Sequence, residues 1–336
     1  MKTILVTGGA GFIGSNFIRY LLNKYPSYRV INLDKLTYAG NLTNLKDVNI
    51  NSRYSFVKGD ICDSVLVECL VKRVDTIINF AAETHVDRSI LSSDDFLKTN
   101  VFGLNQLLKA ALRYKIKRFV QISTDEVYGS IKRGKFKETD ILNPSSPYSS
   151  SKAAGDLLAL SYHATYKLPV IITRSSNNFG PFQYPEKIIP LFITNAITNN
   201  YLPLYGKGEN IRDWIFVEDN CSGVDIALHR GKPGEIYNVG GSCEKTNIEL
   251  TRLVLRLLDK PESLIKKVKD RPGHDFRYAL NCAKLENLGW KKKYSFREAI
   301  KLTIGWYKIN IKWWQDIKNK KEFKTHYSKW YKKRKK

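Results

Sequence analysis

The chain has 336 residues, enough for one large domain or two lobes with a well-buried core. Hydrophobic residues make up 43% and aromatic residues 12% of it, which excludes a disordered or fibrous protein, and no apolar run reaches the ~18 residues of a membrane span. The net charge of +24 suits an anionic ligand such as a nucleotide diphosphate and also allows weak adhesion to nucleic acid.

Part of this charge lies at the C-terminus, where residues 312–336 hold eleven Lys or Arg against two acids, a net +9. A final Lys-rich run is typical of a solvated tail. Just before it, Trp306, Tyr307, Trp313 and Trp314 indicate a packed terminal helix rather than a platform for stacking bases. The cysteines lack CxxC spacing and the histidines lack ligand spacing, so we expect neither disulfides nor a metal site. The apolar start is too short for a signal peptide, and we expect a cytoplasmic protein.

In chain order, short apolar runs alternate with stretches of helical periodicity. The runs that predict strands are residues 3–7, 30–33, 56–57, 76–80, 119–122 and 170–173. The stretches that predict helices are residues 16–23, 94–114 and 149–166. This alternation predicts an α/β protein with a Rossmann-type doubly wound parallel sheet.

The rhythm changes beyond residue 175, where prolines become frequent. We expect residues 1–175 to form the main Rossmann domain, with segments near 213–240 returning to it. Residues 176–310 are expected to form mainly a smaller α+β lobe that holds the substrate, with helices at 247–258 and 296–310. Residues 311–336 are expected to form a basic C-terminal helix or tail.

The first predicted strand runs into a glycine-rich segment, Gly8-Gly9-Ala10-Gly11-Phe12-Ile13-Gly14, and a predicted helix follows. Glycines there allow a tight turn and bring a pyrophosphate close to the N-terminus of the helix. Asp34, at the end of the second predicted strand, is the acid that accepts hydrogen bonds from a ribose diol. Together these features predict an NAD-binding domain, and Lys35 weakens the preference over NADP only slightly. Asp60 either contacts the adenine or, like Asp63, caps the next helix.

A second motif, Ser123-Thr124-Asp125-Glu126-Val127-Tyr128-Gly129, follows the fifth predicted strand. Further along, Tyr148 and Lys152 are four residues apart and so share one face of a helix. We expect the Lys152 ammonium to lower the phenol pKa of Tyr148, with Thr124 bonding the same substrate oxygen, as nicotinamide-dependent alcohol oxidation requires. Asp125 and Glu126 add an acid for a leaving hydroxyl and a base for a carbon-bound proton. The sequence therefore predicts an enzyme that oxidises a sugar in order to dehydrate it.

These residues resemble those of the nucleoside-diphosphate-glucose 4,6-dehydratases, which are extended short-chain dehydrogenases/reductases. The resemblance runs from residue 3 to about residue 310 and rests on the blocks TGGAGFIGSNF, NLDKLTYAGN, NFAAETHVDRSI, ISTDEVYG, PYSSSKAAGD, NNFGP, PEKIIP, LYGKGENIRDWIFVEDN and DRPGHDFRYAL. It implies an NAD-dependent hydro-lyase that converts dTDP-glucose or UDP-glucose to the 4-keto-6-deoxy sugar nucleotide, for the synthesis of deoxysugars such as rhamnose. The sequence leaves the choice between thymidine and uridine open.

In this reaction Tyr148 takes the proton of the 4-hydroxyl while C4 gives a hydride to NAD. Glu126 then removes the C5 proton, which the new ketone has made acidic, and Asp125 protonates the departing 6-hydroxyl. The hydride returns to C6, so the cofactor is regenerated in each turnover. Two adjacent acids can hold opposite protonation states if their surroundings separate their pKa values.

For the cofactor we expect contacts from Gly8, Gly11, Phe12, Ile13, Gly14, Asp34, Lys35, Thr37, Asp60, Ile61, Ala81, Ala82, Thr99, Tyr148, Lys152 and Asn177. The resemblance implies that Thr84, His85 and Asn177 line the sugar or its nearby phosphate. Our candidates for the diphosphate and nucleoside are Asn178, Lys187, Arg212, Asn247, Arg271 and His274. The pyrimidine ring is expected to lie among Pro203, Tyr205 and Tyr278.

Three alternatives remain open from the sequence. A 4-epimerase or a decarboxylase on the same fold is opposed by the presence of both Asp125 and Glu126. A catalytically silent NAD sensor or nucleic-acid-binding protein is favoured only by the basic tail.

The resemblance also implies a homodimer in which the helices at 94–114 and 149–166 form a four-helix interface.

Overall fold

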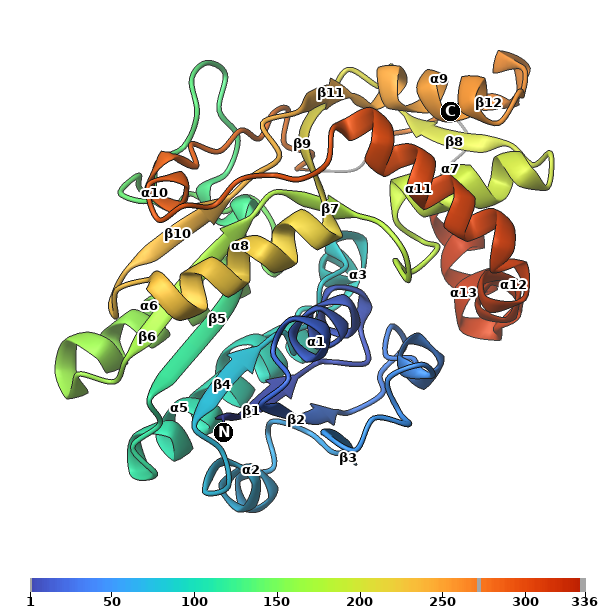
Figure 1. Ribbon diagram of the computed structural model, residues 1–336. Coiled ribbons are helices and arrows are strands. Elements are labelled where there is room, and N and C mark those ends of the chain that lie inside the picture. Colours follow the sequence, from blue (N-terminus) through green and yellow to red (C-terminus); the bar gives the residue numbers. More distant parts are fainter. Residues whose placement is uncertain (1, 271–272, 333–336) are drawn as a thin grey trace.

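The computed structural model describes residues 2–270 and 273–332. Its centre is a seven-stranded parallel sheet in the order β10-β6-β5-β4-β1-β2-β3 (Figure 1). The strands are β1 Lys2–Thr7, β2 Tyr28–Asp34, β3 Tyr54–Lys58, β4 Thr76–Asn79, β5 Arg118–Thr124, β6 Val170–Ser175 and β10 Ile236–Val239. The order reverses between β1 and β4, which is the point where ligands bind in open α/β sheets.

Helices cover both faces of this sheet. On one face α1 (Phe12–Lys24) packs beside α8 (Val217–Arg230), and on the other lie α2 (Ser64–Val71), α5 (Leu104–Arg113) and α6 (Pro147–Tyr166) (Figure 1). Alternate residues of β1 serve the two faces, because Ile4 and Val6 pack in the core with α1 whereas Leu5 packs in the core with α5. The predicted doubly wound Rossmann-type sheet is therefore confirmed.

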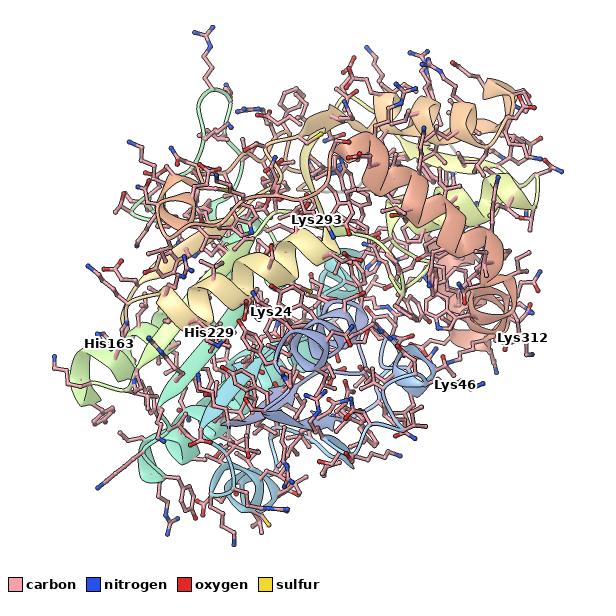
Figure 2. All side chains as sticks on the ribbon, viewed as in Figure 1. Lys24, Lys46, His163, His229, Lys293 and Lys312 are labelled. Atoms are coloured by element: carbon pink, nitrogen blue, oxygen red, sulfur yellow. The ribbon has the colours of Figure 1, made fainter. Side chains whose placement is uncertain are left out.

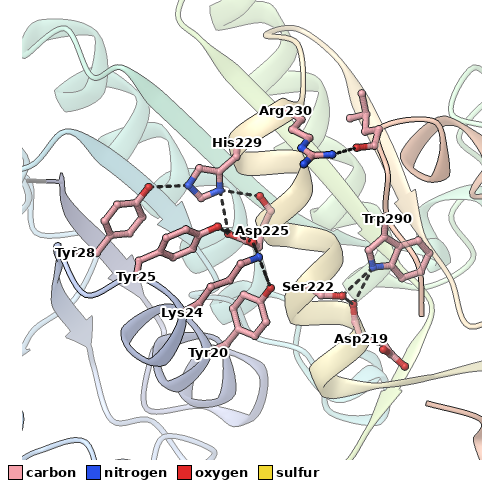
Figure 3. A network of polar contacts seen from close by, with 11 residues as sticks. Tyr20, Lys24, Tyr25, Tyr28, Asp219, Ser222, Asp225, His229, Arg230 and Trp290 are labelled. Carbon is pink, nitrogen blue, oxygen red and sulfur yellow. Dashed lines mark hydrogen bonds and ion pairs between the residues drawn. The ribbon is translucent and has the colours of Figure 1, made fainter. Parts of the chain in front are cut away.

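A polar network fastens α8 to α1 (Figure 3). The buried carboxylate of Asp225, on α8, accepts hydrogen bonds from Lys24 Nζ at 2.7 Å and Tyr25 Oη at 3.0 Å. His229, one turn further along α8, has its Nε2 2.8 Å from the Tyr28 hydroxyl of β2. Helix α8, from late in the chain, is thus held to the end of α1 and to β2 by partly buried polar contacts.

The helix predicted at residues 94–114 is not uniform. It consists of α4 (Asp94–Leu97), a π-helical turn (Lys98–Gly103) and α5. The π turn places the Asn100 side chain where it bonds the backbone of Glu83 and the hydroxyl of Ser151. These tertiary bonds account for a local widening that sequence periodicity does not reveal.

Residues after β6 add two small sheets. One contains β7 (Asn177–Phe179), β9 (Ile211–Phe216) and β11 (Glu244–Thr246), and the other contains β8 (Leu202–Tyr205) and β12 (Ile265–Val268). Helices α7 (Ile188–Ile197), α9 (Asn247–Leu257) and α11 (Phe296–Ile309) pack near these strands, whereas α10 (Ala283–Glu286) packs against β10 and α8, and α3 (Val86–Leu91) follows β4. Within residues 213–240, β10 joins the main sheet and α8 packs against it, whereas β9 belongs to the three-stranded sheet with β7 and β11.

The C-terminus continues as α12 (Ile311–Asn319), α13 (Lys321–Tyr327) and a π-helical segment (Ser328–Lys332). Trp314 and Tyr307 are buried there, which confirms the packed terminal helix rather than the stacking platform. Ile317, Phe323 and Trp330 are buried as well, while the last Lys-rich residues, 333–336, lie outside the described residues. Within residues 2–270 and 273–332, no helix is long and apolar enough to cross a membrane.

Candidate active site

A cavity lies along the carboxyl ends of the central strands. Every residue expected to contact the cofactor lines it: Gly8, Gly11, Phe12, Ile13, Gly14, Asp34, Lys35, Thr37, Asp60, Ile61, Ala81, Ala82, Thr99, Tyr148, Lys152 and Asn177. The same wall contains Thr124, Asp125 and Glu126. The structure thus brings the predicted cofactor and catalytic residues into one site.

The glycine turn fits a pyrophosphate. Gly8 has φ +70, and a Cβ added there would lie 2.6 Å from the backbone nitrogen of Ala81. A Cβ on Gly14 would lie 2.4 Å from the Gly8 carbonyl oxygen, so the close packing of turn and helix requires glycine. Helix α1 has Gly11 at its N-cap, no side-chain cap and no acid in its first turn. No acid of the first turn thus competes for its N-terminal N–H groups, which favours an anion site.

Asp34 and Asp60 occupy the cavity wall in different ways. Asp34 accepts hydrogen bonds from the backbone nitrogens of Ala10 at 2.9 Å and Leu36 at 2.8 Å, which fix its carboxylate at the end of β2. Asp60 pairs with Lys35 at 2.8 Å, while Asp63 is the residue that caps α2. Asp60 therefore lines the cavity, and Asp63 rather than Asp60 caps α2.

The two neighbouring acids lie in unequal surroundings. Thr124 ends β5, caps the short helical turn Asp125–Tyr128 by accepting from the Glu126 nitrogen, and donates to Asp125 Oδ1 at 3.2 Å. The Asp125 side chain is buried, and its Oδ2 has no hydrogen-bond partner among the residues that the structure describes, whereas Glu126 is half-buried. Burial raises the pKa of Asp125 well above its usual range, the Glu126 charge adds to this, and Arg212 opposes it. Burial therefore favours the protonated form of Asp125.

Tyr148 and Lys152 project from the first turns of α6, which begins with Pro147 after a capping box of Ser146 and Ser149. Lys152 Nζ donates to the Ile122 carbonyl at 2.6 Å, and burial lowers the pKa of Lys152 to about 8. The prediction that Lys152 lowers the Tyr148 pKa is wrong for the protein alone. Burial and the Glu126 charge raise that pKa, while a hydrogen bond with Thr124 opposes them.

Four of the predicted substrate residues line the cavity: Thr84, Asn177, Asn178 and Lys187. The Lys187 ammonium donates to the Thr84 carbonyl at 3.3 Å, which ties the loop after β4 to the start of α7. His85 does not line the cavity, since it is buried with its Nε2 3.7 Å from Glu186 Oε1. His85 therefore lies beside Glu186, which does line the cavity.

Six further predicted substrate residues lie outside this cavity, on or after the strands of the two small sheets: Pro203, Tyr205, Arg212, Asn247, His274 and Tyr278. The Arg212 guanidinium stacks on the Tyr278 ring at 4.5 Å. Besides burial, the Glu126 charge raises the pKa of Tyr278, and the Arg212 charge opposes the raised pKa of Asp125. Arg212 and Tyr278 therefore lie near the two acids. Tyr205 on β8 has its ring 5.9 Å from His274. Arg271 lies outside the described residues.

Sequence reasoning missed several cavity residues. Tyr38, Glu83, Tyr184 and Glu186 line the site, and burial raises the pKa of Glu83 to about 7. Tyr38 and Glu186 fall inside the blocks NLDKLTYAGN and PEKIIP, so their positions next to predicted contacts were the available signal. Nothing in the sequence pairs them with each other.

The model of the GDP-mannose 4,6 dehydratase family matches residues 5–303. The chain belongs to this family. A dTDP-glucose 4,6-dehydratase of an Actinoplanes species is 50% identical over 317 residues, which cover 93% of this chain and 99% of that protein. A crystal structure of the dTDP-glucose 4,6-dehydratase of Streptomyces venezuelae, with NAD and TYD bound, is 49% identical with a TM-score of 0.92, covering 94% of this chain and 99% of that one.

The UDP-glucose 4-epimerase of Thermus thermophilus, in complex with NAD, shares the fold at lower similarity. It is 29% identical with a TM-score of 0.84, covering 91% of this chain and 99% of that chain. Family membership confirms the nucleotide-sugar dehydratase recognised from the sequence motifs.

Proposed function

We propose that this chain is a hydro-lyase that removes water from dTDP-glucose to give the 4-keto-6-deoxy sugar nucleotide, with NAD held in the cavity. The observation that carries the proposal is the unequal acid pair, in which Asp125 is buried and Glu126 only half-buried, so that burial favours the protonated form of Asp125. Bound NAD would take the hydride from C4 and return it to C6. The names of the similar enzymes favour thymidine over uridine.

The chain's own residues supply the proton transfers. Tyr148, which lines the cavity together with Thr124, takes the proton of the sugar 4-hydroxyl. Glu126 accepts the C5 proton, and Asp125 gives its proton to the 6-hydroxyl, which leaves as water. Glu126 then returns a proton to C5. The cycle closes when the proton gained by Tyr148 replaces the one that Asp125 gave up, so that electrons and protons balance over one turnover.

The glycine turn and the N-terminus of α1 would hold the pyrophosphate of NAD, and Asp34 its ribose diol. Lys187 would hold the substrate diphosphate, with Asn178 beside it on the cavity wall. The product is a precursor of 6-deoxysugars such as rhamnose. A homodimer through α4–α5 and α6 is supported by exposed apolar side chains on these helices, namely Leu97, Phe102 and Leu157.

The experiment is to incubate the purified protein with dTDP-glucose or UDP-glucose, without added NAD, and to follow the sugar nucleotide by mass spectrometry. Loss of one water from dTDP-glucose, faster than from UDP-glucose, is the expected result. Glu126→Gln should slow this loss by about 10²–10⁴-fold, the range of a general base. An epimer of unchanged mass, or unchanged rates in the variant, would contradict the proposal.

The exposed basic side chains are not confined to the C-terminal tail. Lys46 and Lys293 lie on other parts of the molecule, after β2 and before α11, while Lys312 lies on α12 (Figure 2).

A further inference from the structure

A buried ion pair lies behind the catalytic residues and takes no part in the steps assigned to them. Asp156, on α6, accepts a hydrogen bond from Arg174 Nε, near the end of β6, at 2.9 Å, and the two side chains are 0% and 2% exposed. Asp156 Oδ1 and Arg174 Nη1 have no hydrogen-bond partner among the described residues. Such a pair contributes little stability, because the desolvation of both charges offsets their attraction. The contacts at its two ends, rather than stability, therefore account for its place in the fold.

One end of the pair lies next to Lys152. Asp156 follows Lys152 by four residues on α6, so both side chains lie on the same face of the helix, one turn apart. The Lys152 Nζ donates to the Ile122 carbonyl of β5. Burial lowers the pKa of Lys152 to about 8, and the charge of Asp156 opposes this fall, whereas the acids of the turn Asp125–Tyr128 act on Tyr148. Asp156 thus supplies the negative charge that favours the ammonium form of Lys152.

The other end of the pair lies against the turn that carries the two catalytic acids. The Arg174 guanidinium stacks on the ring of Tyr128, the last residue of that turn, with its Cζ 4.7 Å from the ring centroid. The Tyr128 hydroxyl donates to the buried Asn238 Oδ1 at 2.9 Å, so that both the ring and the hydroxyl are fixed. Arg174 therefore links helix α6 to the turn that carries Asp125 and Glu126.

Building on the proposed function, we propose that Asp156 and Arg174 are positioning residues for the oxidation at C4. Asp156 acts on the charge of Lys152, and Arg174 fixes both the Asp156 carboxylate and the turn that carries the acids. In this step the sugar C4 gives a hydride to NAD and the 4-hydroxyl proton passes to Tyr148, which leaves a ketone and NADH. The Lys152 ammonium is the positive charge among the catalytic residues, so its loss would remove the group that stabilises negative charge on the reacting oxygen.

The first test uses a variant that removes both charges at once, because removal of one partner would leave the other charge buried and uncompensated. Asp156→Asn combined with Arg174→Gln should retain NAD and lower kcat for dTDP-glucose by about 10- to 100-fold, the scale of a small displacement of catalytic groups, with KM changed by less than about twofold. With dTDP-6-deoxyglucose, which has no leaving group at C6, the absorbance of NADH should rise more slowly by the same factor. An unchanged kcat, or a loss confined to KM, would overturn the proposal.

Two further variants guard against a general defect. Arg174→Lys keeps a cation opposite Asp156 and should lose less activity than the double variant. Asp225→Asn is the matched control, because it also removes a buried carboxylate that pairs with a cation, Lys24, but it lies on α8. It should lower the unfolding free energy and leave the formation of NADH as in wild type. If the control slowed this step as much as the double variant does, the assignment to Asp156 and Arg174 would be wrong.

A titration separates this proposal from the function on which it rests. NMR of isotope-labelled lysine side chains, in protein with its retained NAD, follows the Lys152 ammonium, and Lys152→Met assigns the signal. The proton should be lost at a lower pH in the double variant than in wild type, because the Asp156 charge no longer opposes the effect of burial. This result needs no substrate and should hold even if wild type released no water from dTDP-glucose. Equal titration of Lys152 in both proteins would contradict the role given to Asp156.

Discussion

Asp125 and Asp225 are both buried aspartates, at 2% and 1% exposure, but their surroundings differ. Around Asp225, Lys24, Tyr20 and Tyr25 donate hydrogen bonds, and His229 Nδ1 lies 3.0 Å away (Figure 3). Around Asp125, the structure gives the Thr124 hydroxyl on one oxygen and no hydrogen bond on the other.

The pKa values of the two groups move in opposite directions as a result. Burial acts to raise the Asp225 pKa, but hydrogen bonds from His229 and Lys24 outweigh it and the pKa is lowered. Burial and the neighbouring Glu126 charge raise the Asp125 pKa. The hydrogen-bond donors around a buried carboxyl therefore decide whether its charged or its protonated form is favoured.

The largest effect is expected from Asp125→Asn, which keeps the shape of the side chain and removes the transferable proton. Turnover of dTDP-glucose should fall by about 10²–10⁴-fold, as for loss of a general acid. The unfolding temperature should not fall, because no ion pair is broken. Mass spectrometry of the product and thermal unfolding check the two statements, and a variant that keeps its rate refutes the role given to Asp125.

Asp225→Asn should have the opposite profile. It removes charge-assisted hydrogen bonds that join α8 to α1, so unfolding free energy should fall by about 1–3 kcal/mol. Chemical denaturation measures this loss, and turnover well below the unfolding transition should stay within twofold of wild type. An unchanged unfolding free energy would show that the polar network of Figure 3 does not stabilise the packing of α8 on α1.

The two aspartates should also give stability opposite dependences on pH. The lowered Asp225 pKa contributes stability above the unfolded value of about 3.9, which is lost as the pH falls through the folded pKa. The raised Asp125 pKa means that the folded state holds the extra proton, so its contribution declines as the pH rises from about 3.9 toward the folded pKa. Denaturation of wild type and both variants over a pH series would show the difference, and parallel curves would contradict it.

The sequence predicted the cofactor half of the site because its contacts are local. Glycines, a strand end and an acid at fixed spacing suffice to place Gly8, Gly14 and Asp34 in one cavity. The sequence did not predict contacts between side chains that lie far apart along the chain. Arg88 lies 98 residues from Glu186 and 234 from Glu322, and no periodicity signals such a pairing.

Electrostatics escaped prediction for the same reason. The motif of Tyr148 and Lys152 suggests a phenol activated by an ammonium, but burial depends on the packing of all neighbouring elements. In the folded chain burial raises the Tyr148 pKa, and Lys152 donates to the carbonyl of Ile122 instead. Residue types gave the chemistry, while the fold set the proton affinities.

The smallest effect is expected from Glu322→Gln on α13, which holds Arg88 from the solvent side. This carboxylate is half-exposed, so its pair with Arg88 is worth at most about fivefold in kcat/KM for dTDP-glucose. Asp316→Asn on α12, which breaks the exposed pair with Lys312, is the matched control and should change nothing. Equal kcat/KM values for the two variants would show that the contact of α13 with Arg88 has no influence on the site.

The most direct measurement of the stored proton is infrared spectroscopy of the carboxyl groups at neutral pH. The difference between wild type and Asp125→Asn should contain the carbonyl stretch of a protonated carboxylic acid, whereas that between wild type and Asp225→Asn should contain only carboxylate bands. A carboxylate band in place of the acid band for Asp125 would contradict the account.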